Sequence, residues 1–322
     1  MRGVCRYRIL VTGSRGKSSL VRLLCAGIGA KGLSYRGRIT GVLPRELSRG
    51  GERLIVRRAP GHVEEMRWWL RQIPDGAQAV VMENSAVHPE FQPLAAVWLK
   101  PAVIVLTNAR PDHSEAWGEG GEAAARALMR GVPDDAPLVV CDEVLSSGVI
   151  KDRLRSRAGP SLVSRGDERD YCLSNLNLAR KTLEFCGLFG EDADAAMMAL
   201  PPDIGDFRVF HMPCGAELAS AFSANDADST SRLFSLLGWK EEETTLLFSG
   251  REDRPFRRIA FEAFFRRGWQ EVLIQKRTAG AAVLETLIRG KQVLGCGNIA
   301  GAPLELLRKL TEENCRWTIP RA

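Results

Sequence analysis

The sequence contains no uninterrupted apolar stretch of the roughly 18 residues that a membrane-spanning helix needs. It has no C-x-x-C pair among its eight cysteines and no low-complexity segment. The missing apolar stretch argues against a membrane-spanning chain, and the composition argues against a disordered or fibrous one. We therefore expect a cytoplasmic globular enzyme with reduced, mostly buried cysteines, whose N-terminus enters a strand directly without a signal peptide.

Acidic residues are scarce in the first part of the chain. Residues 1–71 hold 16 lysines and arginines against 4 aspartates and glutamates, whereas the whole chain has a formal net charge of +6. A positive field there would attract polyanions, namely nucleotide phosphates, a polycarboxylate substrate or nucleic acid. Solvated surface arginines are the alternative explanation. No stacking motif or recognition helix supports nucleic acid as a partner.

Short β-rich runs alternate with helical patterns along the 322 residues. This alternation predicts an α/β fold with a mainly parallel, doubly wound sheet, followed by a smaller α/β domain. The two prolines and the glycine of Leu200–Asp206 break a helix, so we expect one domain at 1–205 and a second at 206–322. The expected strands of the first domain are Tyr7–Thr12, Leu54–Arg57, Ala79–Met82, Val103–Thr107 and Leu138–Cys141.

The stretch VTGSRGKSS joins the first expected strand to a helical pattern. Gly13 and Gly16 allow a tight turn, and Lys17 and Ser18 open a helix whose exposed amides favour phosphate. The lysine adds positive charge, and the serine hydroxyl suits Mg²⁺. Val11 stands where the common phosphate-binding loop has its first glycine. We interpret the stretch as a shortened phosphate-binding loop, with an ordinary strand-to-helix turn as the alternative.

Polar side chains follow two more of the expected strands. Glu83 comes directly after AVVM, and Asn108, Asp112 and His113 follow VIVLT. Ligands of open α/β sheets bind beyond the carboxyl ends of the strands, so these side chains should lie near the loop. A carboxylate and an imidazole beside a phosphate loop suit Mg²⁺. Taken singly, Glu83 could be a helix-terminal charge and His113 a capping residue.

Three segments, GSRGKS, VMENSAV and TNARPDHSEAWG, together resemble the ATP domain of the Mur ligase superfamily, which makes amide bonds through acyl phosphates. Within it, the chain is most similar to the catalytic subunit of poly-γ-glutamate synthase, the capsule-forming ligase. That family shares the loop arginine, E-x-x-A-V, the D-H pair, and an A-N-D-x-x-S-T segment matched by SANDADSTS. GREDRPFR and GCGNIAG resemble later segments in the same order. The resemblance implies an ATP-binding domain at 1–205 and a C-terminal Mur ligase-like domain at 206–322.

The resemblance also implies ATP and Mg²⁺ as cofactors and gives roles to the matching positions of the first domain. Lys17, Glu83 and His113 would be catalytic, and Ser18, Glu83 and His113 would bind the metal. Asp112 would position the loop that carries His113. The residues that would contact the nucleotide in this domain are Gly13, Ser14, Arg15, Gly16, Lys17, Ser18, Ser19 and Asn108.

In the second domain, the same resemblance implies that Asn225 and Asp226 close over the nucleotide. Arg251 and Arg254 would meet phosphate or a substrate carboxylate. The alternative for this segment is a strand end followed by a helix cap at Ser229 or Thr230.

The implied activity is ATP-dependent amide ligation, in poly-γ-glutamate synthesis or a related γ-glutamyl ligation. Glutamate or a glutamyl polymer would be the substrate, and small membrane subunits or a second copy of the chain would be partners. A cytoplasmic chain would then associate with the membrane only through such subunits. A small-molecule phosphotransferase and a non-catalytic nucleotide-binding subunit of a membrane assembly are the alternatives.

Three features of these families, one found in many poly-γ-glutamate synthases and two found in the Mur ligases proper, have no match in this sequence. It has no N-terminal membrane segment, which argues against direct membrane attachment. It has no lysine between His113 and Lys151 that could be carbamoylated, which argues against a second metal. It also has no N-terminal domain for a UDP-sugar precursor, which argues against a peptidoglycan nucleotide as substrate.

Overall fold

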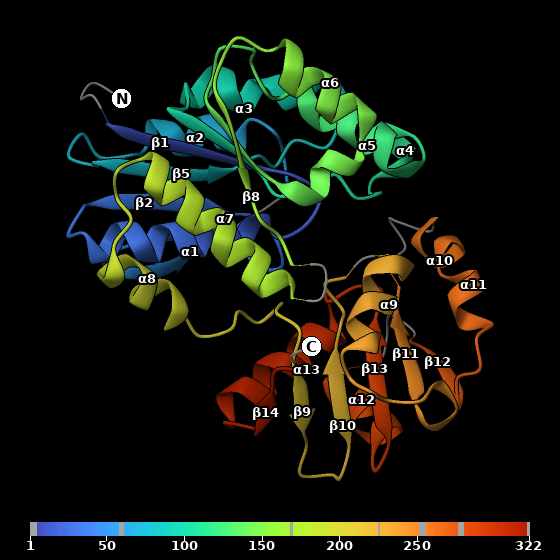
Figure 1. Ribbon diagram of the computed structural model, residues 1–322. Coiled ribbons are helices and arrows are strands. Elements are labelled where there is room, and N and C mark those ends of the chain that lie inside the picture. Colours follow the sequence, from blue (N-terminus) through green and yellow to red (C-terminus); the bar gives the residue numbers. More distant parts are fainter. Residues whose placement is uncertain are drawn as a thin grey trace. The chain divides into compact units, whose positions relative to one another are not determined.

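The computed structural model (Figure 1) describes residues 5–57, 61–167, 170–224, 226–250, 256–275 and 280–320. The chain divides into two compact units, Met1–Pro201 and Pro202–Ala322. The expected ranges 1–205 and 206–322, with their ATP-binding and C-terminal roles, stay predictions.

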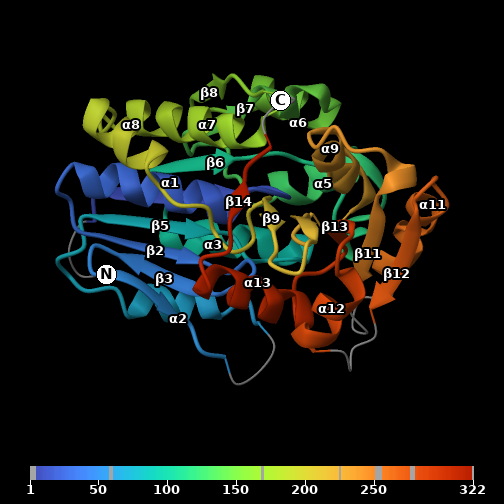
Figure 2. The ribbon, with the colours of Figure 1, turned by 90° about the horizontal axis from the view of Figure 1, so that it is seen from below.

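The described part of unit 1 is built on an eight-stranded sheet in the order β4-β3-β2-β5-β1-β6-β7-β8, and Figure 2 shows several of these strands in succession. Strands β2, β5, β1, β6, β7 and β8 run parallel, whereas β3 and β4 continue from β2 as an antiparallel meander. The loops after β1, β5 and β6 therefore leave the same edge of the sheet. The strands are β1 (Tyr7–Thr12), β2 (Tyr35–Ile39), β3 (Arg45–Ser48), β4 (Gly51–Leu54), β5 (Ala79–Glu83), β6 (Val103–Leu106), β7 (Leu138–Cys141) and β8 (Ser161–Ser164).

Helices cover both faces of this sheet, with α1 and α3 on opposite sides in Figure 1. Side chains alternate along the buried strands, so Ile9 and Val11 of β1 enter one core while Leu10 enters the other. One face is covered by α1 (Lys17–Ala30), α7 (Tyr171–Phe185) and α8 (Glu191–Met198). The other is covered by α2 (Glu65–Arg71), α3 (Gln92–Leu99), α5 (Gly120–Met129) and α6 (Gly148–Ser156). A single turn, α4 (Ser114–Trp117), and two short 3₁₀ helices at Pro89–Phe91 and Asp142–Ser146 complete the described helices of this unit.

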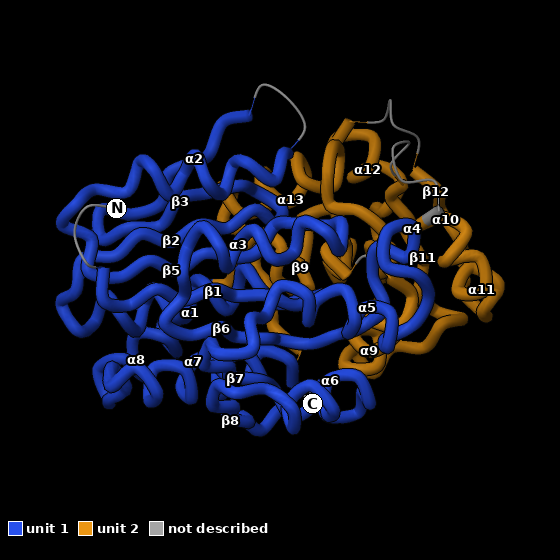
Figure 3. The backbone as a smooth tube through the Cα atoms, turned by 90° about the horizontal axis from the view of Figure 1, so that it is seen from above, with its two compact units in different colours: residues 1–201 blue, residues 202–322 orange. Residues whose placement is uncertain are grey.

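Unit 2, orange in Figure 3, has a sheet of six described strands in the order β12-β11-β13-β10-β9-β14. Strands β12, β11, β13 and β10 are parallel, and β9 and β14 are antiparallel to their neighbours. The strands are β9 (Val209–His211), β10 (Glu217–Ser220), β11 (Thr245–Ser249), β12 (Glu271–Gln275), β13 (Gln292–Cys296) and β14 (Trp317–Thr318). The helices are α9 (Ala227–Ser235), α10 (Phe256–Ala260), α11 (Glu262–Phe265), α12 (Ala281–Ile288), α13 (Ala302–Glu312) and a 3₁₀ turn at Glu241–Glu243.

The expected fold class, a mainly parallel doubly wound sheet with a smaller α/β partner, is confirmed. The expected strand Leu54–Arg57 is wrong, because β4 ends at Leu54. Its apolar run suggested a buried strand, but it lies at the sheet edge, where Leu54 is 53% and Val56 is 86% exposed.

Candidate active site

Two glycines shape the loop between β1 and α1. Gly13 has φ 133° and Gly16 has φ 77°, both in the region that favours glycine. A Cβ atom on Gly13 would lie 2.0 Å from Thr107 Oγ1, so no side chain fits there. In the described structure Gly16 precedes α1 without a side-chain cap. The first amides of α1 are therefore available to an anion.

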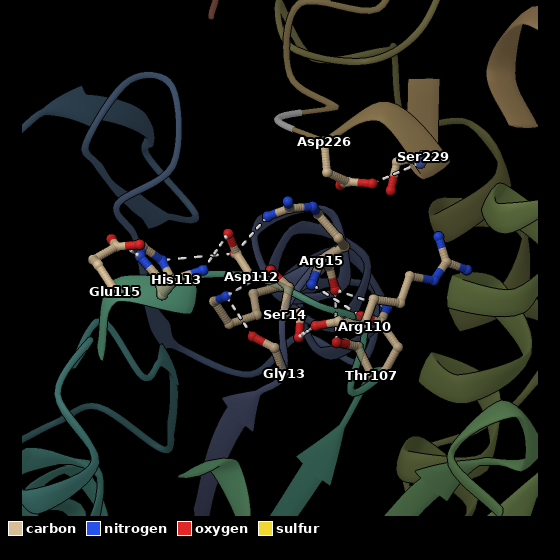
Figure 4. A network of polar contacts seen from close by, with 12 residues as sticks. Gly13, Ser14, Arg15, Thr107, Arg110, Asp112, His113, Glu115, Asp226 and Ser229 are labelled. Carbon is tan, nitrogen blue, oxygen red and sulfur yellow. Dashed lines mark hydrogen bonds and ion pairs between the residues drawn. The ribbon is translucent and has the colours of Figure 1, made fainter. Parts of the chain in front are cut away.

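Hydrogen bonds fasten this loop to the segment after β6 (Figure 4). Asn108 Oδ1 accepts from the backbone N–H of Arg15 at 3.0 Å, and Asn108 Nδ2 donates to the Arg15 carbonyl at 3.2 Å. Thr107 Oγ1 donates to the same carbonyl at 2.6 Å. Ser14 Oγ donates to the Arg110 carbonyl at 2.7 Å. The structure thus brings together the two segments that the sequence analysis expected at the same edge of the sheet.

Lys17 begins α1, and its ammonium group bends back over the loop. Nζ donates to the carbonyl oxygens of Gly13 at 2.6 Å and Ser14 at 3.3 Å. Burial lowers the pKa of Lys17, while the charges of Glu83 and Asp112 act in the opposite direction. The loop therefore holds a desolvated cation at the start of its helix, where a phosphate would bind. Ser19, which was also predicted to contact the nucleotide, is the third residue of the same helix.

Glu83 is the last residue of β5 and is only 2% exposed. Its Oε2 accepts a hydrogen bond from Ser18 Oγ at 2.8 Å. Its Oε1 accepts from both the backbone N–H and the hydroxyl of Thr40, which follows β2. Glutamate, serine and threonine oxygens thus converge at the loop, and oxygen is the ligand atom that Mg²⁺ prefers.

Thr40 is a site residue that the sequence analysis missed. It follows YRGRI, which has no continuous apolar run and was not identified as a strand. The alternation of Tyr35, Gly37 and Ile39 towards one face is the signal that could have revealed the strand and its polar end.

His113 lies at the start of α4 with φ 46°. Its Nδ1 is 3.5 Å from Glu115 Oε1, its Nε2 is 3.6 Å from Asp112 Oδ2, and its ring centroid is 5.2 Å from that of Trp117. Figure 4 shows the imidazole between the two carboxylates. These contacts place His113 in a group of ionic side chains after β6.

The same group contains Arg15, whose Nη1 lies 2.6 Å from Asp112 Oδ2. Burial alone would raise the pKa of Asp112, but the positive charges of Arg15, His113 and Lys17 outweigh it and hold that pKa below its ordinary value of 3.8. Asp112 is therefore an ionised partner of the loop arginine.

Among the described side chains, no group of three or more histidines, cysteines, aspartates or glutamates is arranged to hold a metal ion. The structure joins Ser18 to Glu83 and joins His113 to Asp112 and Glu115. A metal role for Ser18, Glu83 and His113 together stays a prediction.

In unit 2, Asp226 is the N-cap of α9, and its carboxylate accepts from the Ser229 backbone N–H at 2.7 Å (Figure 4). The alternative of a cap at Ser229 or Thr230 is therefore wrong, because the helix already starts at Ala227. The contribution of Asp226 to a nucleotide site stays a prediction. Three further residues with predicted roles lie outside the described residues: Asn225, Arg251 and Arg254.

None of the helices in the part of the chain that the structure describes is long and apolar enough to cross a membrane.

Known proteins resemble this chain in sequence and in fold. PGA synthase CapB of Bacillus subtilis (strain 168) is 26% identical over 275 residues, which cover 79% of this chain and 70% of that protein. Capsule biosynthesis protein CapB of Bacillus anthracis is 25% identical over 277 residues, which cover 79% and 59%. The structure of a MurF ligase from Thermotoga maritima in complex with ADP shares the fold, with a TM-score of 0.67 and 13% identity over 96% of this chain and 81% of that one.

Two family matches span most of both units. Residues 214–282 match the poly-gamma-glutamate synthase CapB C-terminal domain, and residues 11–186 match the Mur ligase middle domain. These matches confirm the resemblance inferred from the sequence motifs. The match to the Mur ligase middle domain alone spans more than half of the residues of this chain, and the chain therefore belongs to the Mur ligase family.

Proposed function

We propose that this protein is an ATP-dependent amide ligase that activates a carboxylate as an acyl phosphate and joins it to an amine, in poly-γ-glutamate synthesis or a related γ-glutamyl ligation. One observation carries the proposal. The loop that holds Lys17 and Ser18 contacts the buried carboxylate of Glu83, in a chain of the Mur ligase family. The similarity to PGA synthase CapB over 79% of the chain supports the γ-glutamyl substrate.

ATP is the proposed phosphoryl donor, and the ADP bound to the related MurF ligase supports this choice. The amides that follow Gly16 and the ammonium of Lys17 would hold its phosphates. Arg15 would leave or share its contact with Asp112 to reach them. The Asn108 side chain would act through the backbone of Arg15, because its amide oxygen accepts from the Arg15 N–H and its amide nitrogen donates to the Arg15 carbonyl.

Mg²⁺ fits the polar group at Glu83, because the side chains there supply only oxygen atoms and one carries a negative charge. Ser18, Glu83 and Thr40 would hold the ion, and His113 would bind it or orient the γ-phosphate. When bound, Mg²⁺ draws charge away from the phosphate oxygens.

The proposed reaction has two steps. A carboxylate oxygen of the glutamyl substrate attacks the γ-phosphorus of ATP, which forms an acyl phosphate and releases ADP. The amine of the next amino acid then attacks the acyl carbon and forms the amide. The bond to phosphate breaks, and the departing inorganic phosphate takes up the proton that the amine loses. Lys17 neutralises the transferred phosphoryl group, so the contribution of the protein is positioning and charge stabilisation.

Hydroxylamine trapping tests this proposal. Protein with ATP, Mg²⁺ and glutamate should form a hydroxamate, and Lys17→Ala should abolish it. Lys181→Ala, which removes a surface lysine on α7 paired with Glu184, is the control and should retain activity. ADP without hydroxamate would favour a small-molecule phosphotransferase, and ATP binding without turnover would favour a non-catalytic subunit. We also propose that small membrane subunits or a second copy of the chain bind this protein, and copurification can test both.

A further inference from the structure

One face of the meander β2–β3–β4 carries charged side chains. Because side chains alternate along a strand, Arg36 and Arg38 of β2, Glu46 of β3 and Arg53 of β4 lie on the same face. Arg38 stands opposite Glu46, and Glu46 stands opposite Arg53. Helix α2 packs against this face at Glu46, since Trp69 Nε1 donates to Glu46 Oε2 at 2.7 Å.

Two arginines share one carboxylate at the start of α2. Glu65 Oε2 accepts from Arg38 Nη2 at 3.1 Å and from Arg57 Nη2 and Nε at 2.7 and 3.0 Å. The Arg38 side chain is 1% exposed, whereas that of Arg57 is 26% exposed. A buried charge is stable only where other groups compensate it, and here one carboxylate faces two guanidinium groups.

The remaining pairs on this face are looser. Arg53 Nη2 lies 3.5 Å from Glu46 Oε1, and Arg36 Nε lies 3.9 Å from the same atom. The Arg53 side chain is 76% exposed and that of Arg36 is 32% exposed. We call the three partly exposed arginines, Arg36, Arg53 and Arg57, the arginine face; the buried Arg38 is not part of it. Its ion pairs in the described structure involve only Glu46 and Glu65, which leaves an excess of positive charge.

The buried Arg38 connects the arginine face to the candidate active site, because it shares Glu65 with Arg57. Arg38 precedes Thr40 by two residues, about 7 Å along an extended strand. Arg38 Nη1 donates to Ser85 Oγ at 3.3 Å, and Ser85 follows Glu83 by two residues. Burial lowers the pKa of Arg38, and the charges of Glu83 and Glu65 oppose this effect, which places Glu83 within electrostatic range of the guanidinium group.

We propose that the arginine face binds the free α-carboxylates of a γ-linked glutamyl chain whose reacting end lies at Glu83. This inference rests on the proposed function and adds where the polymer is held. A γ-linked chain carries one free α-carboxylate per residue, and guanidinium groups bind carboxylates through paired N–H donors. The existing pairs with Glu46 and Glu65 show that these arginines already engage carboxylates.

A binding assay on the full chain tests the proposal. The probe is a fluorescent γ-linked glutamyl oligomer of about ten residues, titrated at low and at moderate salt because screening weakens exposed ion pairs. Arg53→Glu should weaken binding roughly tenfold at low salt, and the difference should shrink as salt rises. Arg57→Gln should also weaken binding, through loss of a guanidinium group beside Glu65.

Arg155→Glu is the matched control, because Arg155 is 78% exposed and has a similarly loose partner, Asp152, at 3.6 Å. It should bind the oligomer like the wild type, and all variants should show the wild-type thermal unfolding. Equal binding by Arg53→Glu and Arg155→Glu would overturn the inference, as would displacement of the oligomer by a much lower concentration of a single-stranded oligonucleotide of equal charge. Failure of the proposed function appears separately, as a wild-type protein that forms no glutamate-dependent hydroxamate.

Discussion

Ser18 Oγ lies 2.8 Å from Glu83 Oε2, although 65 residues separate the two in the chain. The contact forms because β1 and β5 are adjacent parallel strands with Val11 in register with Glu83. The helix that follows β1 therefore begins beside the end of β5. Thr40, at the end of β2 on the other side of β5, donates to the second carboxylate oxygen. Neighbouring strand ends thus supply the oxygen atoms proposed to hold Mg²⁺.

Glu83→Gln should remove activity while largely preserving the fold. The amide has the size of the carboxylate but lacks its charge, so glutamate-dependent ATP turnover should fall roughly 100-fold. Turnover measured across a range of Mg²⁺ concentrations should also require more Mg²⁺. Glu90→Gln, on a 59% exposed side chain after the same strand, is the control and should leave both unchanged. Wild-type turnover and Mg²⁺ dependence in Glu83→Gln would remove Glu83 from the metal site.

Gly13→Ala tests the close approach of the loop to β6. The added Cβ would meet Thr107 Oγ1 at 2.0 Å, and the backbone at φ 133° disfavours alanine. We expect a loss of about 1–3 kcal/mol in the free energy of unfolding and weaker ATP binding, measured by urea unfolding and by titration. Gly76→Ala, where a Cβ would meet nothing within 4 Å, should change neither. An unaltered Gly13→Ala protein would show that the loop does not need this contact.

Two substitutions of Asp226 can separate its role as a helix cap from its predicted role in nucleotide binding. Asp226→Ala removes the N-cap of α9 and should lower the free energy of unfolding by about 1 kcal/mol. Asp226→Ser keeps a capping oxygen, so it should retain most of that stability. ATP titration of the serine variant then isolates the predicted nucleotide role, because weaker binding in a capped helix can only come from the lost carboxylate. Asp228→Ala, on an exposed side chain of the same helix, is the control.

The sequence predicted the centre of the first sheet better than its edge. Buried parallel strands are continuous apolar runs, so Tyr7–Thr12 and Leu138–Cys141 have the expected bounds. The meander strands Tyr35–Ile39 and Arg45–Ser48 carry arginines and glutamates on one face, and their pattern was not recognised. Thr40 was missed with them.

The site shows the same division between local and tertiary information. The glycines of the loop follow from local chemistry, because a tight turn after a strand needs them. The partners of Asn108 and Asp112 do not, since they depend on which strand ends become neighbours after folding. Both residues hold Arg15, one through its backbone and the other through its guanidinium group.

The pair of Arg15 and Asp112 should make stability depend on pH. The pKa of Asp112 lies below its ordinary value of 3.8, because the charges of Arg15, His113 and Lys17 outweigh the effect of burial. The unfolded chain therefore takes up the proton at a higher pH than the folded one. The ionised carboxylate stabilises the folded state above about pH 4, and this contribution disappears as the pH falls through the lowered pKa.

Asp112→Asn should accordingly lose about 1–3 kcal/mol in the free energy of unfolding at pH 7, because the hydrogen bond to Arg15 loses its charge. The difference from the wild type should shrink as the pH falls below 4 and the wild-type carboxylate is protonated. Urea unfolding at pH 7, 5 and 3 measures it, with Asp135→Asn on an exposed side chain as the control. A difference that stays constant over this range would mean that the charge of Asp112 does not stabilise the loop, and that the backbone contacts of Arg15 to Thr107 and Asn108 contribute more than its ion pair.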